Sequence, residues 1–179
     1  MCQEDEEANM NFAKLIVGVL TSDRESLDIV LKQLSERFGK ADMVSQWRSF
    51  THTDYYADEM GSNLYRCFVS FEKLVMPSKA VEFKGWTSEI EDEHRMDGRR
   101  TVNLDPGYLD SNKVVLVTGK HGGHKIALAP GVWADLLLWY NKGWQALPWA
   151  FPDFRDGGWF DTFIGMRKIF KDRIKGEPS

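Results

Sequence analysis

The sequence predicts a single α+β domain built on a mostly antiparallel sheet. Apolar strands alternate with amphipathic helices in the first half, whereas the second half holds short strands separated by tight turns. The chain has 179 residues, enough to bury a core, and its hydrophobic share of 42% is typical of a globular domain. We expect one domain over residues 13–175, preceded by a disordered acidic tail over residues 1–12.

The first half predicts a split β-α-β-β-α-β arrangement. Its expected elements are a strand at 14–20, a helix at 24–38, a long hairpin at 43–74 and a helix at 77–94. Gly39 ends the first helix, and Pro77 opens the second. In residues 64–74 the alternation predicts a strand with the Cys67 face inward. This order resembles the split motif of ferredoxin-like domains.

The second half predicts a β-meander followed by a C-terminal helix. Its expected strands cover residues 114–118, 125–129, 132–140 and 144–149. Turn residues separate them, among them the Gly122-Gly123 and Pro130-Gly131 pairs. Apolar residues at helical spacing then predict a helix from about residue 159 to 175.

Composition excludes several classes of protein. A formal net charge of -4 argues against a nucleic-acid partner, which a basic face would bind. The two cysteines, Cys2 and Cys67, are too few for a disulfide framework. The longest apolar runs are far shorter than the roughly 18 residues that a membrane span needs. We therefore expect a cytoplasmic protein with no membrane partner.

Three familiar motifs are incomplete. Thr118-Gly119-Lys120 resembles the end of a phosphate loop but lacks the upstream glycine and the following helix. His121 and His124 flank a Gly-Gly turn, where they either share a metal ion or lie exposed to solvent. His52-Thr53 supplies half of a two-histidine phosphoesterase site, but the second half would need a hydroxyl in place of Ile126. The sequence specifies no cofactor and no metal site.

The strongest polar constellation lies between residues 99 and 125. Asn103 and Asp105 alternate on one face of a short strand, and a Pro-Gly turn is expected to place Tyr108 beside them. These side chains either satisfy the backbone of the turn or point into a cleft. Neighbouring cations, which suit an anionic ligand, come from Arg100, Lys120 and Lys125.

Two further segments are candidate rims of a pocket. Asp54, Tyr55 and Glu59 either line it or merely end a strand and form a turn. The segment WAFPDF, which contains Asp153, either caps a pocket or covers the core.

With these motifs, the chain resembles the domain-of-unknown-function 4416 family of bacterial proteins. The resemblance rests on TDYYADEMG (53–61), FVSFEKL (68–74), TSEIE (87–91), VNLDPGYL (102–109), VTGK (117–120), HKIAL (124–128) and WAFPDF (149–154). It implies no established activity, although relatives sometimes carry a GTP-binding label that the missing phosphate loop does not support. It adds Glu91 to the candidate residues. Phe154 and Asp135 depart from the Tyr and Glu frequent in the family, which puts strict catalytic roles there in doubt.

Two hypotheses follow. In the first, the protein binds or acts on a small anionic ligand, such as a nucleotide or a phosphorylated metabolite. The candidate catalytic residues are Asp54, Glu59 and Asp105. The candidate ligand-binding residues are Tyr55, Glu91, Arg100, Asn103, Tyr108, Lys120, Lys125 and Asp153. In the second, the protein is a non-catalytic interaction module that uses an aromatic surface, with a homo-oligomer as one form of it.

Overall fold

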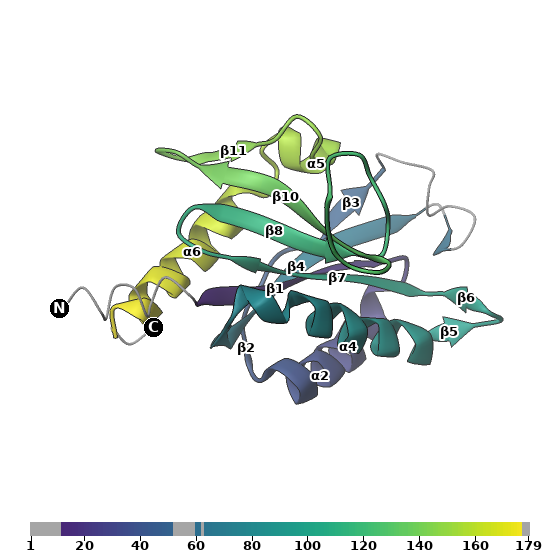
Figure 1. Cartoon of the computed structure of the whole chain (residues 1–179). Helices are drawn as coiled ribbons and strands as arrows, with labels where there is room; N and C mark the ends of the chain where they lie inside the picture. The colour runs from purple at the N-terminus through teal and green to yellow at the C-terminus, as the bar shows by residue number, and fades with distance from the viewer. Residues whose placement is uncertain (1–11, 52–59, 62, 177–179) are drawn as a thin grey trace.

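A computed structural model describes residues 12–51, 60–61 and 63–176 of the chain. Nine strands form one antiparallel sheet in the order β11-β10-β8-β7-β1-β4-β2, with β3 also paired to β4 and β9 also paired to β10 (Figure 1). The strands are β1 (Ala13–Thr21), β2 (Ala41–Val44), β3 (Arg48–Phe50), β4 (Leu64–Val75), β7 (Val102–Leu109), β8 (Lys113–Thr118), β9 (Ile126–Ala129), β10 (Val132–Tyr140) and β11 (Trp144–Ala146). A separate small hairpin pairs β5 (Arg95–Met96) with β6 (Arg99–Arg100).

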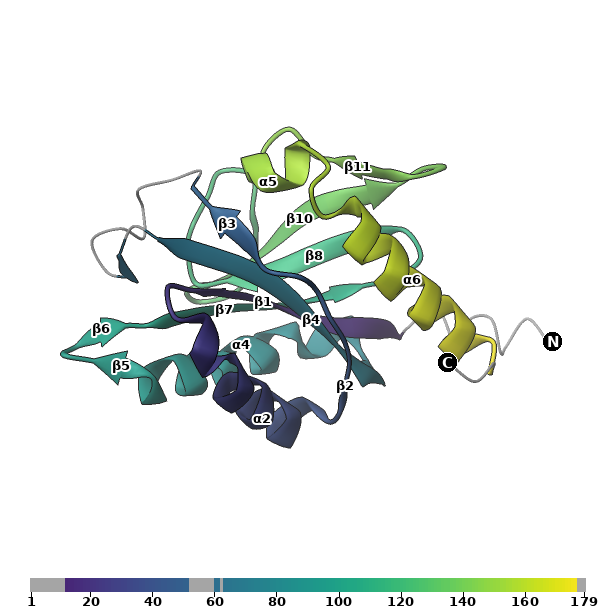
Figure 2. The same cartoon turned by 180° about the vertical axis from the view of Figure 1, so that it is seen from behind.

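Helices lie on both faces of the sheet. The helical segments are η1 (Arg24–Ser26), α2 (Leu27–Phe38), η3 (Pro77–Lys79), α4 (Ala80–Glu93), α5 (Pro152–Arg155) and α6 (Phe160–Ile174). Figure 2 shows α6 crossing one face, with α2 and α4 side by side on the other. The α+β class, the single domain and the C-terminal helix are thus confirmed.

The predicted split β-α-β-β-α-β unit is present. The order β7-β1-β4-β2 places the last strand of the unit beside the first, and every pairing is antiparallel. The predicted hairpin at 43–74 appears as β2 and β3, which both pair with β4. Residues 1–11 and 52–59, which include most of the predicted tail and one candidate rim, lie outside the described residues.

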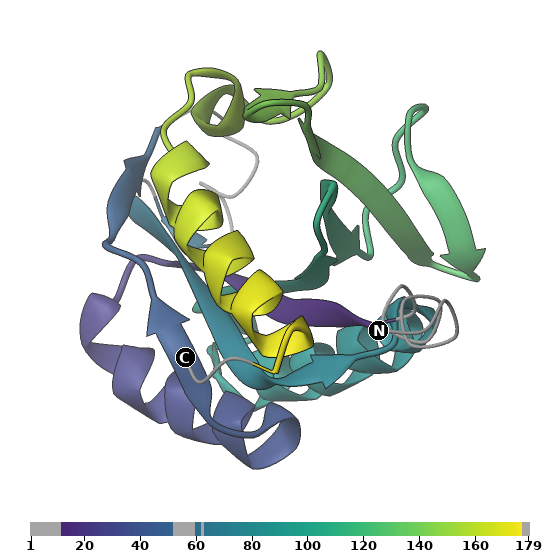
Figure 3. The same cartoon turned by 90° about the vertical axis from the view of Figure 1, so that its left-hand side faces the viewer.

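The second half extends the sheet on the β7 side. A simple meander would place β9 between β8 and β10, but β10 pairs directly with β8, and β9 pairs with the opposite edge of β10. The loop of residues 119–125 therefore carries the chain past the end of β10. The extended sheet curls around α6, as the end-on view of Figure 3 shows.

Each face of the sheet carries a large hydrophobic core, and a smaller cluster holds Leu20, Phe50, Met60 and Leu64. Phe68, Leu109 and Leu116 pack with α6 on its face, while Cys67, Val69 and Leu104 belong to the core of α2 and α4. Only the Cys67 face of β4 was expected to point inward. Both faces are buried because α6 covers the other one, where even Ser70 is inaccessible to solvent.

The expected Pro-Gly turn at residues 106–107 is wrong, since both residues lie inside β7. Gly107 pairs with Leu116 so closely that a Cβ there would lie 2.1 Å from the Val115 carbonyl oxygen. The glycine is required by this close approach of two strands rather than by a turn. No helix of the described residues is long and apolar enough to span a membrane.

Candidate functional site

The strand register collects polar side chains at one end of the α6 face. Asn103 and Arg66 are both paired with Leu20. Asp105 and Phe68 are both paired with Gly18, and Phe68 belongs to the core that packs against α6. Residues directly opposite each other in antiparallel strands share a face. Arg66, Asn103 and Asp105 therefore lie on the same face of the sheet as α6.

A charged pair from α4 occupies a seam between β7 and β8. These strands pair only over residues 107–109, so the earlier part of β7 lacks a β8 partner within the described chain. Lys84 Nζ donates to the Leu104 carbonyl at 2.9 Å, and the Leu104 N–H donates to Glu91 Oε1 at 2.6 Å. The Lys84 and Glu91 side chains are buried and 3.3 Å apart. The pair thus supplies the hydrogen bonds that a neighbouring strand would otherwise make.

Polar contacts extend from this pair to the predicted site residues. Arg100 Nη1 lies 3.8 Å from Glu91 Oε2 and donates to Asn103 Oδ1 at 3.2 Å. Asn103 Nδ2 in turn donates to Asp105 Oδ2 at 2.9 Å. Burial raises the pKa of Glu91, and the nearby Lys84 ammonium opposes that rise. Four predicted residues, Glu91, Arg100, Asn103 and Asp105, thus form one connected group.

A second charged group surrounds Asp135 on β10. This carboxylate is buried, and its Oδ2 lies 3.6 Å from His124 Nε2 and 3.7 Å from Lys125 Nζ. Asp135 Oδ1 accepts no hydrogen bond from the described residues. Burial raises the pKa of Asp135, against the influence of the Lys125 and His124 charges. Lys125 Nζ also donates to the Lys120 carbonyl at 3.1 Å, so both predicted lysines belong to this loop.

Two tryptophans flank the same loop. The His124 ring stacks on Trp149 with centroids 5.7 Å apart and 24° between the planes. Trp149 is held by a hydrogen bond from its Nε1 to the Leu136 carbonyl at 2.9 Å, yet 44% of the residue stays exposed. His121 contacts Trp133 edge to face, with ring centroids 4.6 Å apart. Both imidazoles are therefore placed by indole rings.

Asp153 belongs to a third polar group, between α5 and β4. Its Oδ2 accepts hydrogen bonds from Arg66 Nη1 at 2.7 Å and from Trp159 Nε1 at 2.9 Å. The Arg66 guanidinium lies 4.2 Å from the Phe50 ring centroid and 5.1 Å from that of Phe151. This buried ion pair therefore holds α5 against the sheet.

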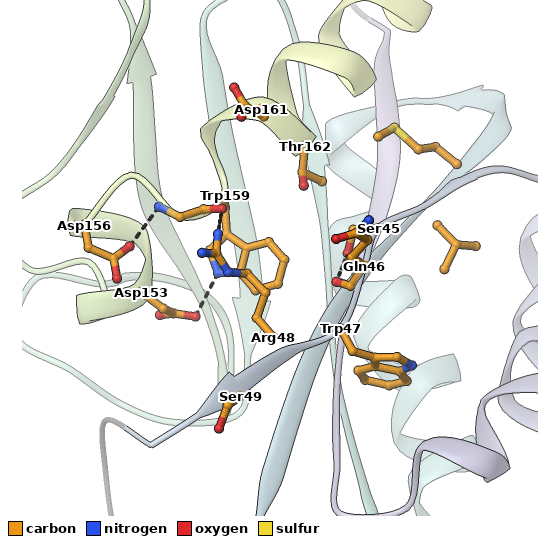
Figure 4. A pocket seen from close by; sticks show the side chains of 13 residues that line it. Ser45, Gln46, Trp47, Arg48, Ser49, Asp153, Asp156, Trp159, Asp161 and Thr162 are labelled. Atoms are coloured by element: carbon orange, nitrogen blue, oxygen red, sulfur yellow. Dashed lines mark hydrogen bonds between the residues drawn. The ribbon is translucent and has the colours of Figure 1, made fainter.

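A cavity of about 820 Å³ opens beside Asp153 (Figure 4). One wall is the connection from β2 to β3, and the other is the segment from α5 into the first turn of α6. The charged residues that line the cavity are Arg48, Asp153, Asp156 and Asp161.

The remaining predicted residues lie apart from these groups or outside the described chain. Tyr108 is paired with Leu15 of the α2 and α4 core, so it faces away from Asp105, and burial raises its pKa. Asp54, Tyr55 and Glu59 lie outside the described residues. Both interpretations of this segment, as the rim of a pocket or as a strand end and turn, therefore stay hypotheses.

Three members of these polar groups were not predicted from the sequence: Lys84, Arg66 and Asp135. Lys84 and Glu91 are seven residues apart on one helix, a spacing that places both on the same side. Asp135 is an acid inside the apolar run VWADLLLWY, which is a signal of a buried, partnered charge. For Arg66 the alternation of β4 offered no comparable signal, because its partner is 87 residues away.

Across the part of the chain that the structure describes, no three His, Cys, Asp or Glu residues are grouped to hold a metal ion. No curated protein and no solved structure matches the chain. A family model described as a domain of unknown function (DUF4416) matches residues 11–170. Because this match spans most of the chain, and because the quoted motifs fall within it, the protein belongs to the DUF4416 family.

Proposed function

We propose that the protein binds a small anionic ligand at the loop of residues 119–125. The observation that carries this proposal is local charge. The loop GKHGGHK holds two lysines, two histidines and no acid, in a chain whose net charge is -4. Asp135 beneath it offsets one positive charge and holds His124 and Lys125 in place. Positive groups fixed in this way favour a carboxylate or a phosphate.

The surroundings of the loop favour a ligand that also carries an aromatic ring, such as a nucleotide. Trp149 presents a half-exposed indole next to His124, and such a ring is a stacking platform for a base. In this proposal Lys120, His124 and Lys125 contact the anion.

A thermal-shift screen followed by calorimetric titration tests this proposal. The probes are GTP, AMP, glucose 6-phosphate and inorganic phosphate. A ligand at a hundredfold excess over its Kd adds about 2.7 kcal/mol to the free energy of unfolding. The variants His124→Gln and Lys125→Gln should each weaken binding about tenfold to a hundredfold, because a hydrogen bond to a charged group is worth about 1.5–3 kcal/mol. Lys32→Gln, an exposed lysine on α2, is the matched control. A screen without response to any probe would contradict the proposal.

Exposed apolar residues on the outer strands support a second candidate, self-association. Ile126 and Leu128 on β9 and Trp139 on β10 are 66%, 41% and 45% exposed. Ile126 is paired with Ala134, so it faces away from Asp135 and α6. Large exposed apolar side chains favour a protein contact. Sedimentation equilibrium of the wild type and of Ile126→Lys tests it: self-association that Ile126→Lys weakens supports this candidate, and a wild type that is monomeric at high concentration contradicts it.

A further inference from the structure

We propose that the cavity beside Asp153 binds an organic cation whose ammonium or guanidinium group donates to the Asp153 carboxylate. This site is separate from the 119–125 loop, and its ligand has the opposite charge.

One oxygen of the Asp153 carboxylate is unpartnered. Arg66 and Trp159 both donate to Asp153 Oδ2, whereas Oδ1 accepts no hydrogen bond from the described residues. Asp153 is only 7% exposed, and it lines the cavity. Buried carboxylate oxygens are normally hydrogen-bonded. Oδ1 is closed to solvent, so a ligand's donor would complete this carboxylate once the atoms that cover Oδ1 move aside.

The lining of the cavity carries a net negative charge. Arg66 offsets Asp153, which leaves Asp156 and Asp161 against the positive charge of Arg48. This charge favours a cation over an anion. An ammonium or guanidinium group also supplies the N–H donors that a carboxylate oxygen accepts.

The cavity already accommodates a guanidinium. The Arg48 guanidinium lies 5.4 Å from the Trp159 ring centroid and donates to the Gly158 carbonyl oxygen. Gly158 allows this approach, because a Cβ there would lie 2.6 Å from Arg48 Nη1. Figure 4 shows Arg48 beside Trp159 and Asp153 within the cavity. A flat cationic group on an indole is a favourable arrangement. Arg48 therefore acts as an internal competitor of the proposed ligand.

The cavity also has the size of a small-molecule site. A volume of about 820 Å³ falls within the range of about 300–1,000 Å³ that is usual for small-molecule sites. The cavity thus has room for a chain of several carbons attached to the cationic group.

Calorimetric titration with agmatine and spermidine tests this inference. Agmatine carries a guanidinium and an ammonium, whereas spermidine carries only ammonium-type groups, so the pair tells which group the site prefers. We expect at least one of the two to bind the wild type with a stoichiometry of one. Arg48→Gln should bind it more tightly, because the internal competitor is gone. That gain is a result that a merely structural role of Arg48 would not produce.

Two carboxylate variants and one control complete the test. Asp161→Asn, at the exposed start of α6, should weaken binding about threefold to fivefold, as expected for a surface charge. Asp153→Asn should weaken binding by at least about tenfold. If Asp153→Asn does not fold, Asp161→Asn still tests the inference. Asp28→Asn on α2 removes the same charge far from the cavity and should change nothing. The inference is overturned if neither the wild type nor Arg48→Gln binds either probe at millimolar concentration, or if Asp28→Asn weakens binding as much as Asp161→Asn.

Discussion

The Lys84–Glu91 pair and the Asp135 group place similar charges in contrasting surroundings. Lys84 and Glu91 both bond directly to the backbone of Leu104, at 2.9 and 2.6 Å. Around Asp135, His124 and Lys125 stand 3.6 and 3.7 Å from one carboxylate oxygen, and the other oxygen has no donor among the described residues. The first pair completes a sheet edge, whereas the second group holds charges that are only loosely satisfied.

This difference separates structural charges from available ones. A buried charge whose bonds are all made within the fold has little left to offer a ligand. A carboxylate with an unfilled oxygen, next to a partly exposed imidazole on an exposed indole, still has bonds to make. The sequence did not predict this distinction, because predicted ligand-binding residues occur in both groups: Glu91 in the first and Lys125 in the second.

The largest expected effect is on stability at the seam. Glu91→Ala should lower the free energy of unfolding by about 3–5 kcal/mol, because it leaves the Lys84 ammonium buried and unpaired and the Leu104 N–H without an acceptor. Urea denaturation followed by circular dichroism measures the change. The double variant Lys84→Met/Glu91→Leu should recover part of the loss. A loss below about 1 kcal/mol in Glu91→Ala would show that the seam is not held by this pair.

A smaller effect is expected in the pH dependence of stability. The pKa of Glu91 in the folded protein is raised above its ordinary value of 4.5, chiefly by burial. Between these two values the folded state binds more protons than the unfolded state, so this group's contribution falls as pH rises through that window. The stability difference between the wild type and Glu91→Gln should therefore decrease as pH increases from 4.5. Urea titrations at several pH values check the slope, and an increase over that window would contradict the burial of this carboxyl.

A still smaller effect is expected at Asp135. Asp135→Asn should change the free energy of unfolding by less than about 1 kcal/mol, because contacts at 3.6 and 3.7 Å are longer than hydrogen bonds and the desolvation of the charge disappears with it. The same denaturation assay measures it, with Glu91→Gln as the matched comparison. A loss as large as that of Glu91→Gln would remove the distinction between the two groups.

The smallest effect on stability is expected at His124. His124→Gln should change the free energy of unfolding by less than about 0.5 kcal/mol, as for most partly exposed positions. Ligand binding should nevertheless weaken, because the imidazole beside Asp135 contacts the proposed anion. Calorimetric titration of both proteins measures this, with His94→Gln as a control, because His94 contacts Gln33 far from the loop. Equal ligand binding by His124→Gln and the wild type would contradict the part assigned to His124.

The sequence predicted elements better than it predicted the polar site. The helical spacing of Leu27, Val30, Leu31 and Leu34 and the apolar run of residues 14–20 match α2 and β1 within a few residues. Arg100, Asn103 and Glu91 were each predicted to bind a ligand, and the structure places their side chains in one polar group. Their partner Lys84 was not predicted. Lys84 bonds to β7 where β7 has no β8 partner, and that gap depends on how the strands pair rather than on a local sequence pattern.

By itself, the sequence determined the α+β class, the split first half and the C-terminal helix, because periodic burial marks each element along its own length. Only the tertiary structure decided that β9 pairs on the far edge of β10, that Pro106 and Gly107 lie within a strand, and that Asp153 meets Arg66. These features depend on contacts between residues far apart in the chain. Such contacts depend on how the strands and helices pack against one another, and a local sequence pattern does not predict that packing.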